Sequence, residues 1–282
     1  MQFRHFSFNI NGSAIKGEIK GNQSAPLVVF LHGAAMDYRM FDRQVNALLQ
    51  AGYRVLLWDL RGHGNSQPLG KTPISITDFT EDLCQLLEKL NISEKICLIG
   101  HSLGGLIVQD LVYRYPEKCT SFVIIGATCS SLPIYWWEYI ALKSSPMWLN
   151  FYPYSDVLKM IATTSLSPHT QSYAYTAASK LNKDTFMEIW QAIANALNPK
   201  ANYRIEIPFL LTHGQEDKAG NVAQSAVQWA KRDQDYCHYH PIPQAGHNAN
   251  QDQADYFNQL MLSFLAQHHP LAGKDKTTFA YD

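Results

Sequence analysis

The sequence predicts an α/β protein in which helices cover both faces of a mostly parallel sheet and a helical segment is inserted into the chain. Short apolar runs alternate with helical patterns, as in consecutive strand–helix–strand units. These runs are continuously apolar, which is typical of parallel strands buried on both faces. The alternation stops between about residues 127 and 200 and then resumes, which indicates the insertion.

Five continuous apolar runs are the predicted core strands. They are Leu27–Leu31, Tyr53–Trp58, Ile96–Ile99, Phe122–Ile125 and Phe209–Thr212. A last strand is expected at Tyr236–Ile242. Two N-terminal segments, Phe3–Phe8 and Ala14–Ile19, alternate between apolar and polar residues instead. They fit an antiparallel edge hairpin that turns at Asn11-Gly12.

Apolar residues at helical spacing predict three helices in the core. The first extends from about Ile76 to Leu90, and either Ser75 or Thr77 caps its start. The second extends from Leu106 to Tyr115, and the third from Ala249 to Leu265.

The inserted segment is expected to be a mostly helical cap between the strands Phe122–Ile125 and Phe209–Thr212. It holds four of the six tryptophans and six of the fifteen tyrosines. The predicted organisation is a core of residues 1–126 and 201–269, a cap of residues 127–200 and a polar C-terminal tail of residues 270–282.

Composition narrows the classes of function. The 282 residues are 46% hydrophobic and 17% charged, with a formal net charge of −1. This balance is that of a globular protein, and nothing in it favours nucleic acid or an anionic membrane surface as a partner. The N-terminus is polar and alternating, and no apolar run approaches the ~18 residues of a membrane span. A cytoplasmic protein without an integral membrane segment is therefore expected; the oligomeric state stays open.

The five cysteines are irregularly spaced and include no CxxC pair, so reduced, buried thiols are expected rather than a disulfide framework. Cys237, His238 and His240 raise the possibility of a metal site, but no carboxylate partner accompanies them. We therefore predict neither a metal nor another cofactor.

The strongest chemical signal is Gly100-His101-Ser102-Leu103-Gly104, which matches the pattern G-x-S-x-G. A predicted strand precedes it and a predicted helix follows it, so Ser102 lies on a sharp strand-to-helix turn. Side chains two residues away would clash in such a turn, and glycine removes the clash. The amides at the start of the helix favour negative charge that develops at the serine. Ser102 is the predicted nucleophile.

A serine nucleophile needs a base at neutral pH, and the base needs a carboxylate that orients it. His247 follows the last predicted strand and precedes the last helix, so it is the predicted base. Asp217 follows the strand Phe209–Thr212 and is preferred over its neighbour Glu216. The other position for the acid, after Phe122–Ile125, offers no carboxylate.

Two backbone N–H groups are needed to stabilise a tetrahedral oxyanion. One is assigned to Leu103, directly after the nucleophile. The other is assigned to Ala34, in the loop after Leu27–Leu31, where Gly33 permits a sharp turn.

These motifs together resemble the α/β-hydrolase superfamily over nearly the whole chain. His32-Gly33 resembles its oxyanion loop, Asp59 to Ser66 its D-x-R-G-x-G-x-S turn, Gly100 to Gly104 its nucleophile elbow, Gly214 to Asp217 its acid loop, and Gly246-His247 its base. The resemblance implies an eight-stranded, mostly parallel sheet with a helical cap, and a structural role for Asp59 and Arg61. The sequence departs from the family in lacking a proline soon after Asp217.

A serine at the elbow implies acyl transfer, because relatives that open epoxides or remove halogens carry aspartate there. The expected substrate is a small-molecule ester with an apolar part, and Trp136, Trp137 and Trp148 of the cap are expected to bind it. The same residues have an alternative role in packing the cap onto the core. Thioester hydrolysis, carbon–carbon bond hydrolysis and ligand binding without turnover remain open.

Overall fold

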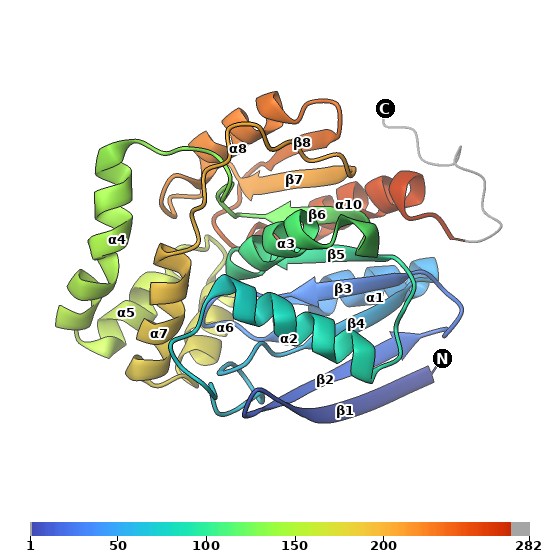
Figure 1. The fold of residues 1–282 in the computed structure, drawn as a ribbon, viewed down its shortest axis with the longest axis horizontal. Coiled ribbons are helices and arrows are strands. Elements are labelled where there is room, and N and C mark those ends of the chain that lie inside the picture. The colour runs from blue at the N-terminus through green and yellow to red at the C-terminus, as the bar shows by residue number, and fades with distance from the viewer. Residues whose placement is uncertain (1, 272–282) are drawn as a thin grey trace.

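A computed structural model of the chain describes residues 2–271. It contains one eight-stranded sheet in the order β1-β2-β4-β3-β5-β6-β7-β8 (Figure 1). The strands are β1 (Gln2–Ile10), β2 (Ser13–Gly21), β3 (Leu27–Leu31), β4 (Arg54–Trp58), β5 (Ile96–His101), β6 (Cys119–Ile125), β7 (Phe209–Gly214) and β8 (Cys237–Ile242). β1 pairs antiparallel with β2, and β2 with β4, whereas all the other pairs are parallel. The predicted mostly parallel sheet and its N-terminal edge hairpin are confirmed.

Helices connect these strands. They are α1 (Asp42–Ala51), α2 (Ile76–Lys89), α3 (Leu103–Arg114), α4 (Trp136–Phe151), α5 (Tyr154–Ala162), α6 (Pro168–Ala178), α7 (Lys183–Ala194), α8 (Val222–Arg232), α9 (Ala249–Asp252) and α10 (Ala254–His268). The start of α2 shows how local sequence sets a boundary. Ser75 Oγ accepts from the N–H of Asp78, and the Asp78 carboxylate accepts from the N–H of Ser75. This capping box selects Ser75 over Thr77 as the cap.

Two of the predicted helices differ from the structure, and two helices were not predicted. α3 begins at Leu103, three residues before the predicted start, because the turn at Ser102 leads directly into the helix. The predicted C-terminal helix is broken at Gln253 into α9 and α10. The sequence analysis did not predict α1 and α8. The predicted C-terminal tail lies outside the described residues from residue 272 on.

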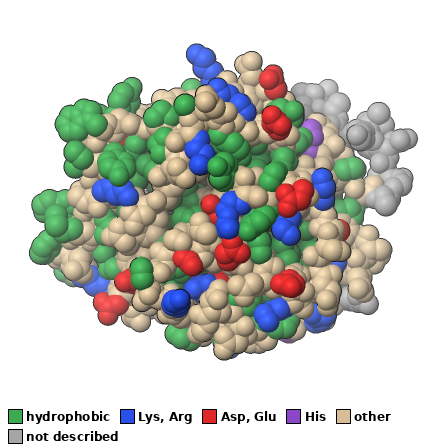
Figure 2. Space-filling view, in the orientation of Figure 1, with side chains coloured by type: hydrophobic (Ala, Val, Ile, Leu, Met, Phe, Trp, Pro, Cys, Tyr) green, Lys and Arg blue, Asp and Glu red, His purple; other side chains and the backbone are tan. Residues whose placement is uncertain are grey.

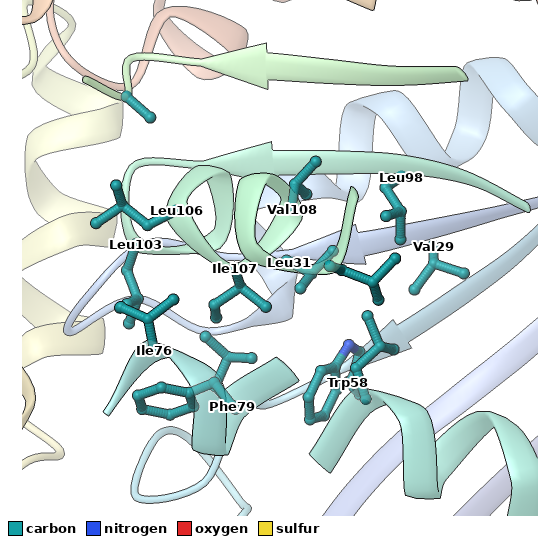
Figure 3. Packing of buried hydrophobic residues seen from close by; sticks show 14 of the residues in the cluster. Val29, Leu31, Trp58, Ile76, Phe79, Leu98, Leu103, Leu106, Ile107 and Val108 are labelled. Atoms are coloured by element: carbon teal, nitrogen blue, oxygen red, sulfur yellow. The ribbon is translucent and has the colours of Figure 1, made fainter. Parts of the chain in front are cut away.

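Side chains alternate between two buried layers, one on each face of the sheet. Val29 and Leu31 of β3 pack with residues of α2, α3 and α8, whereas Val28 and Phe30 pack with residues of α1 and α10. Figure 3 shows the first layer, in which Ile107 of α3 lies among the strand residues and the side chains of α2. Both faces are covered, which explains why the core strands are continuously apolar.

The register of the parallel strands brings their carboxyl ends to one edge. His101 of β5 is opposite Ile125 of β6, which in turn is opposite Thr212 of β7. These strands point toward the side of the molecule where α4 to α7 lie (Figure 1). The four helices form the insertion between β6 and β7, as predicted. The division into core and cap at residues 126 and 200 stays a prediction.

Candidate active site

Ser102 occupies the sharp turn between β5 and α3. Its backbone has φ +49° and ψ −110°, a conformation that residues with a side chain rarely adopt. Its N–H donates to Ile125 O at the end of β6 (2.9 Å). A Cβ at Gly100 would overlap the backbone of Gly104, and a Cβ at Gly104 would overlap Leu31 O. The glycines therefore permit the close approach of α3 to the sheet that holds the turn.

The predicted acid and base form a hydrogen-bonded pair. His247 Nδ1 lies 2.9 Å from Asp217 Oδ2, and the Asp217 side chain is fully buried. Burial by itself raises the pKa of Asp217, but the charge of His247 and hydrogen bonds from His247 and the Ala219 N–H outweigh it, and the pKa lies below its ordinary value. An ionised Asp217 accepts from Nδ1–H, which leaves the Nε2 lone pair of neutral His247 free to take a proton. Glu216, the alternative acid, is exposed.

Gly126, the residue that directly follows β6, lies beside the acid–base pair. Its φ is +59°, and a Cβ there would lie 3.2 Å from His247 Nδ1 and 3.3 Å from Asp217 Oδ2. The acid–base pair occupies the space that a side chain at this position would need. No acid follows β6 in the sequence, and in the structure the space beside Gly126 holds Asp217, which follows β7, and His247, which follows β8.

His101 supports the base and does not compete with it. It is buried, and its Nε2 lies 3.1 Å from His247 O. Burial, with the neighbouring charge of His247, lowers the pKa of His101 to about 3. The neutral ring donates Nε2–H, since a carbonyl oxygen only accepts. Its side chain is thus directed at the backbone of the base.

The oxyanion loop after β3 lies beside the nucleophile. A Cβ at Gly33 would be 3.4 Å from Ser102 Cβ. His32 Nε2 accepts from the Leu60 N–H (2.9 Å), so Nδ1 carries the proton and donates to Gly33 O (2.8 Å). Within the described chain the N–H groups of Ala34 and Leu103 donate to no other residue. They remain the predicted donors to an oxyanion.

Asp59 and Arg61 hold loops, in agreement with the role implied for them. The Asp59 carboxylate accepts from the N–H of Tyr38 (3.0 Å) and of Asn65 (2.7 Å), which joins the oxyanion loop to the turn after β4. Arg61 forms a buried ion pair with Asp82 of α2.

The predicted substrate-binding tryptophans lie on the surface of the cap. Trp136, Trp137 and Trp148 of α4 are 75%, 55% and 58% exposed. Figure 2 shows hydrophobic side chains at the edge of the molecule that α4 and α5 occupy. A cavity of about 390 Å³ is lined by Trp136, Pro133 and Leu197, among others, and by no residue of the predicted triad. The role of these tryptophans in binding stays a prediction.

The remaining sequence predictions concern a metal site, the cysteines and a membrane span. Among residues 2–271, no three His, Cys, Asp or Glu side chains are grouped so that they could hold a metal. His238, which was considered as a ligand, packs its ring against Phe264. The five cysteines are unpaired. No helix in this part of the chain has both the length and the apolar character that a membrane span requires.

The sheet order, the helical insertion after β6 and the strand-to-helix serine turn define an α/β-hydrolase fold. The sequence model of the family described as serine aminopeptidase, S33, matches residues 22–254, and the chain belongs to this family of α/β-hydrolases.

Relatives and solved structures agree with this class. The chain is 25% identical over 278 residues to a 2-hydroxy-6-oxononadienedioate/2-hydroxy-6-oxononatrienedioate hydrolase of a Pseudomonas species, covering 92% of this chain and 95% of that one. It is 26% identical over 272 residues to 3-oxoadipate enol-lactonase 1 of Acinetobacter baylyi, covering 91% and 95%. A thermophilic esterase from Thermogutta terrifontis superposes with a TM-score of 0.79 at 18% identity, covering 95% and 100%.

Sequence reasoning missed the residues that hold the base in place. Besides His101, these are Thr164, whose carbonyl accepts from the His247 N–H, and Asp252, whose carboxylate accepts from the Gly246 N–H. Asp252 follows His247 by only five residues, but no local pattern distinguishes it from other acids near a helix start. Thr164 is remote in sequence, and no signal indicated it.

Proposed function

We propose that the protein is a serine hydrolase that cleaves a small-molecule ester with an apolar part. The observation that carries this proposal is the pairing of a buried Asp217 with His247 at 2.9 Å, on the strand edge where the Ser102 turn lies. The esterase and the enol-lactonase among the similar proteins support the ester as the bond that is cleaved, since a lactone is a cyclic ester.

In the proposed mechanism, Ser102 Oγ attacks the ester carbonyl while His247 Nε2 takes its proton. The tetrahedral oxyanion accepts from the N–H groups of Ala34 and Leu103. Protonated His247, stabilised by Asp217, then gives its proton to the leaving alcohol. Water attacks the acyl-enzyme with His247 again as base, which releases the acid and restores Ser102.

The test is turnover of a panel of p-nitrophenyl esters and acyl thioesters by the wild-type protein and by Ser102→Ala. We expect esters with apolar acyl groups to be cleaved and a fluorophosphonate probe to label Ser102. Removing the serine of such a triad costs on the order of 10⁶ in kcat, so Ser102→Ala should abolish turnover. Retention of more than a tenth of wild-type activity would contradict the nucleophile assignment.

The panel also separates the alternatives. With a diketone added to the panel, a labelled enzyme that cleaves only thioesters, or only the carbon–carbon bond of the diketone, would replace the ester in this proposal. Saturable binding of the ester without turnover would identify a ligand-binding protein instead.

A further inference from the structure

One carboxylate joins the loop of the base to the cap. Asp252, the last residue of α9, accepts three backbone N–H groups. Its Oδ2 accepts from Gly246 N (2.9 Å) and from Leu166 N (2.9 Å), and its Oδ1 accepts from Ser167 N (3.0 Å). Gly246 directly precedes the base, whereas Leu166 and Ser167 belong to the segment between α5 and α6 of the cap.

Two contacts of the backbone bring the same segments together. The His247 N–H donates to Thr164 O (2.9 Å). A Cβ at Gly246 would overlap Thr164 O and would lie 3.1 Å from Ser165 Cα, so only a glycine permits this approach. The base loop and residues 164–167 of the cap are therefore one hydrogen-bonded unit, in which Asp252 provides three of the bonds.

Asp252 also completes the start of α6. Ser167 is the N-cap of α6, and its side chain makes no capping hydrogen bond. The N-terminus of a helix carries unpaired N–H groups and a partial positive charge, which a carboxylate stabilises. The cap helix takes this carboxylate from a residue 85 positions later in the chain. The negative charge of Asp252 thus stabilises both the N-terminus of α6 and the loop that carries His247.

We propose that Asp252 is a positioning residue for the base, through which the position of the cap sets the position of His247. Asp252 touches none of the reacting atoms. It acts by holding Gly246 against the cap segment, which keeps the His247 ring in place against Asp217. The proposal rests on the proposed function only where it takes His247 to be the base.

The effect on the rate follows from geometry. A catalytic group that moves by about 1 Å can lose on the order of 100-fold in rate even when the change is remote from the chemistry. In Asp252→Asn, one of the two acceptor oxygens becomes an NH₂ group that faces a backbone N–H. At least one of the three hydrogen bonds to residue 252 is then lost. We expect the loop that carries His247 to be held less closely against residues 164–167 of the cap.

The experiment compares Asp252→Asn with Asp255→Asn. The variant Asp255→Asn removes the same charge three residues later, where the carboxylate is 83% exposed and pairs with Arg43 at the surface. For Asp252→Asn we expect kcat and the rate of Ser102 labelling by a fluorophosphonate to fall on the order of 10- to 100-fold, with KM within about twofold. Asp255→Asn should stay within about twofold in all three.

Amide hydrogen exchange provides a readout that needs no substrate. In Asp252→Asn, exchange should become faster both at residues 164–167 and at residues 246–252, and in Asp255→Asn at neither. A folded Asp252→Asn protein with unchanged labelling and kcat, or with faster exchange in only one of the two segments, would overturn the proposal. Asp252→Glu keeps the charge but displaces the oxygens by one methylene, and it is measured in the same way if Asp252→Asn does not fold.

Failure of the proposed function would look different. If no ester is cleaved but the probe labels wild-type Ser102, the ester is wrong, and labelling and exchange still decide the role of Asp252. If wild-type Ser102 is not labelled, the triad assignment fails, and the positioning role fails with it.

Discussion

His247 is held from three directions by residues of three different segments. Asp217 binds its Nδ1, His101 donates to its carbonyl oxygen, and Thr164 accepts its N–H. The bond from Asp217 fixes the tautomer and the orientation of the imidazole ring. The bonds from His101 and Thr164 fix the backbone that carries the ring. At the scale of residues, the chemistry therefore depends on a ring whose tautomer and position are both determined.

The first prediction at the scale of residues concerns the acid, Asp217. Asp217→Asn should reduce kcat on the order of 10⁴-fold, because an amide at this position stabilises the wrong tautomer of the base. Glu216→Gln should change kcat by less than about twofold, since Glu216 is exposed. Steady-state kinetics of both variants at neutral pH provide the measurement, and the reverse ranking would transfer the acid to Glu216.

Among the elements, helix α4 exposes large apolar side chains that a surface helix normally buries. Apolar side chains of a surface helix normally face the core, yet Trp136, Trp137, Ile140 and Trp148 of α4 are all more than half exposed. Of its sixteen residues only Pro146 is buried. Aromatic side chains in this helix thus have surface available for an apolar ligand, and their role in binding the substrate stays a prediction.

A series of esters tests this role of α4. With acyl groups of increasing length, kcat/KM should rise in the wild-type protein, because each buried methylene contributes about 0.8 kcal/mol, or roughly fourfold. Trp136→Ala or Trp137→Ala should flatten the trend. Tyr256→Ala, at an exposed aromatic of α10 outside the cap, should leave the trend unchanged. If neither tryptophan variant alters the ranking of substrates, these side chains do not bind the substrate.

For the whole molecule, buried histidines link stability to pH. Burial lowers the pKa of His269 to about 4, although its Nε2 bond to Leu27 O acts in the other direction. Burial also lowers the pKa values of His63 and His101 to about 3. Above about pH 6.5 these rings are neutral in both the folded and the unfolded chain. As pH falls, the unfolded chain takes up protons first, so the free energy of unfolding decreases between about pH 6.5 and 4.

His269→Gln isolates one of these contributions. His269 joins the end of α10 to Thr120 of β6 and to Leu27 of β3. Its displaced pKa corresponds to about 3 kcal/mol, lost as pH falls from about 6.5 to 4. In urea unfolding from pH 7 to 4.5, the variant should lose stability less steeply, by up to about 1.4 kcal/mol per pH unit. His169→Gln, at an exposed position of α6, is the control. Parallel stability curves for wild type and His269→Gln would contradict the prediction.

Local patterns were sufficient to predict the layers of the fold and to identify candidates for the chemical residues. Continuous apolar runs predicted the parallel strands, and the glycines around Ser102 predicted a strained turn, because both depend on neighbours within a few residues. Ser102, Asp217 and His247 each follow a core strand, and the carboxyl ends of parallel strands meet at one edge. The order of the motifs along the chain therefore already predicted that these three residues share one edge of the sheet, where Asp217 and His247 form a hydrogen bond.

The tertiary structure decided what holds the site in place and which surfaces are exposed. Asp252 bonds to Leu166 and Ser167, and His247 to Thr164, across more than 80 residues of sequence. An acceptor for a backbone N–H has no characteristic sequence, since any backbone carbonyl or side-chain oxygen serves. Whether a tryptophan of α4 is buried likewise depends on what the rest of the chain packs against it. Only the packing of the cap on the core settles contacts of this kind, because the residues involved share no local pattern.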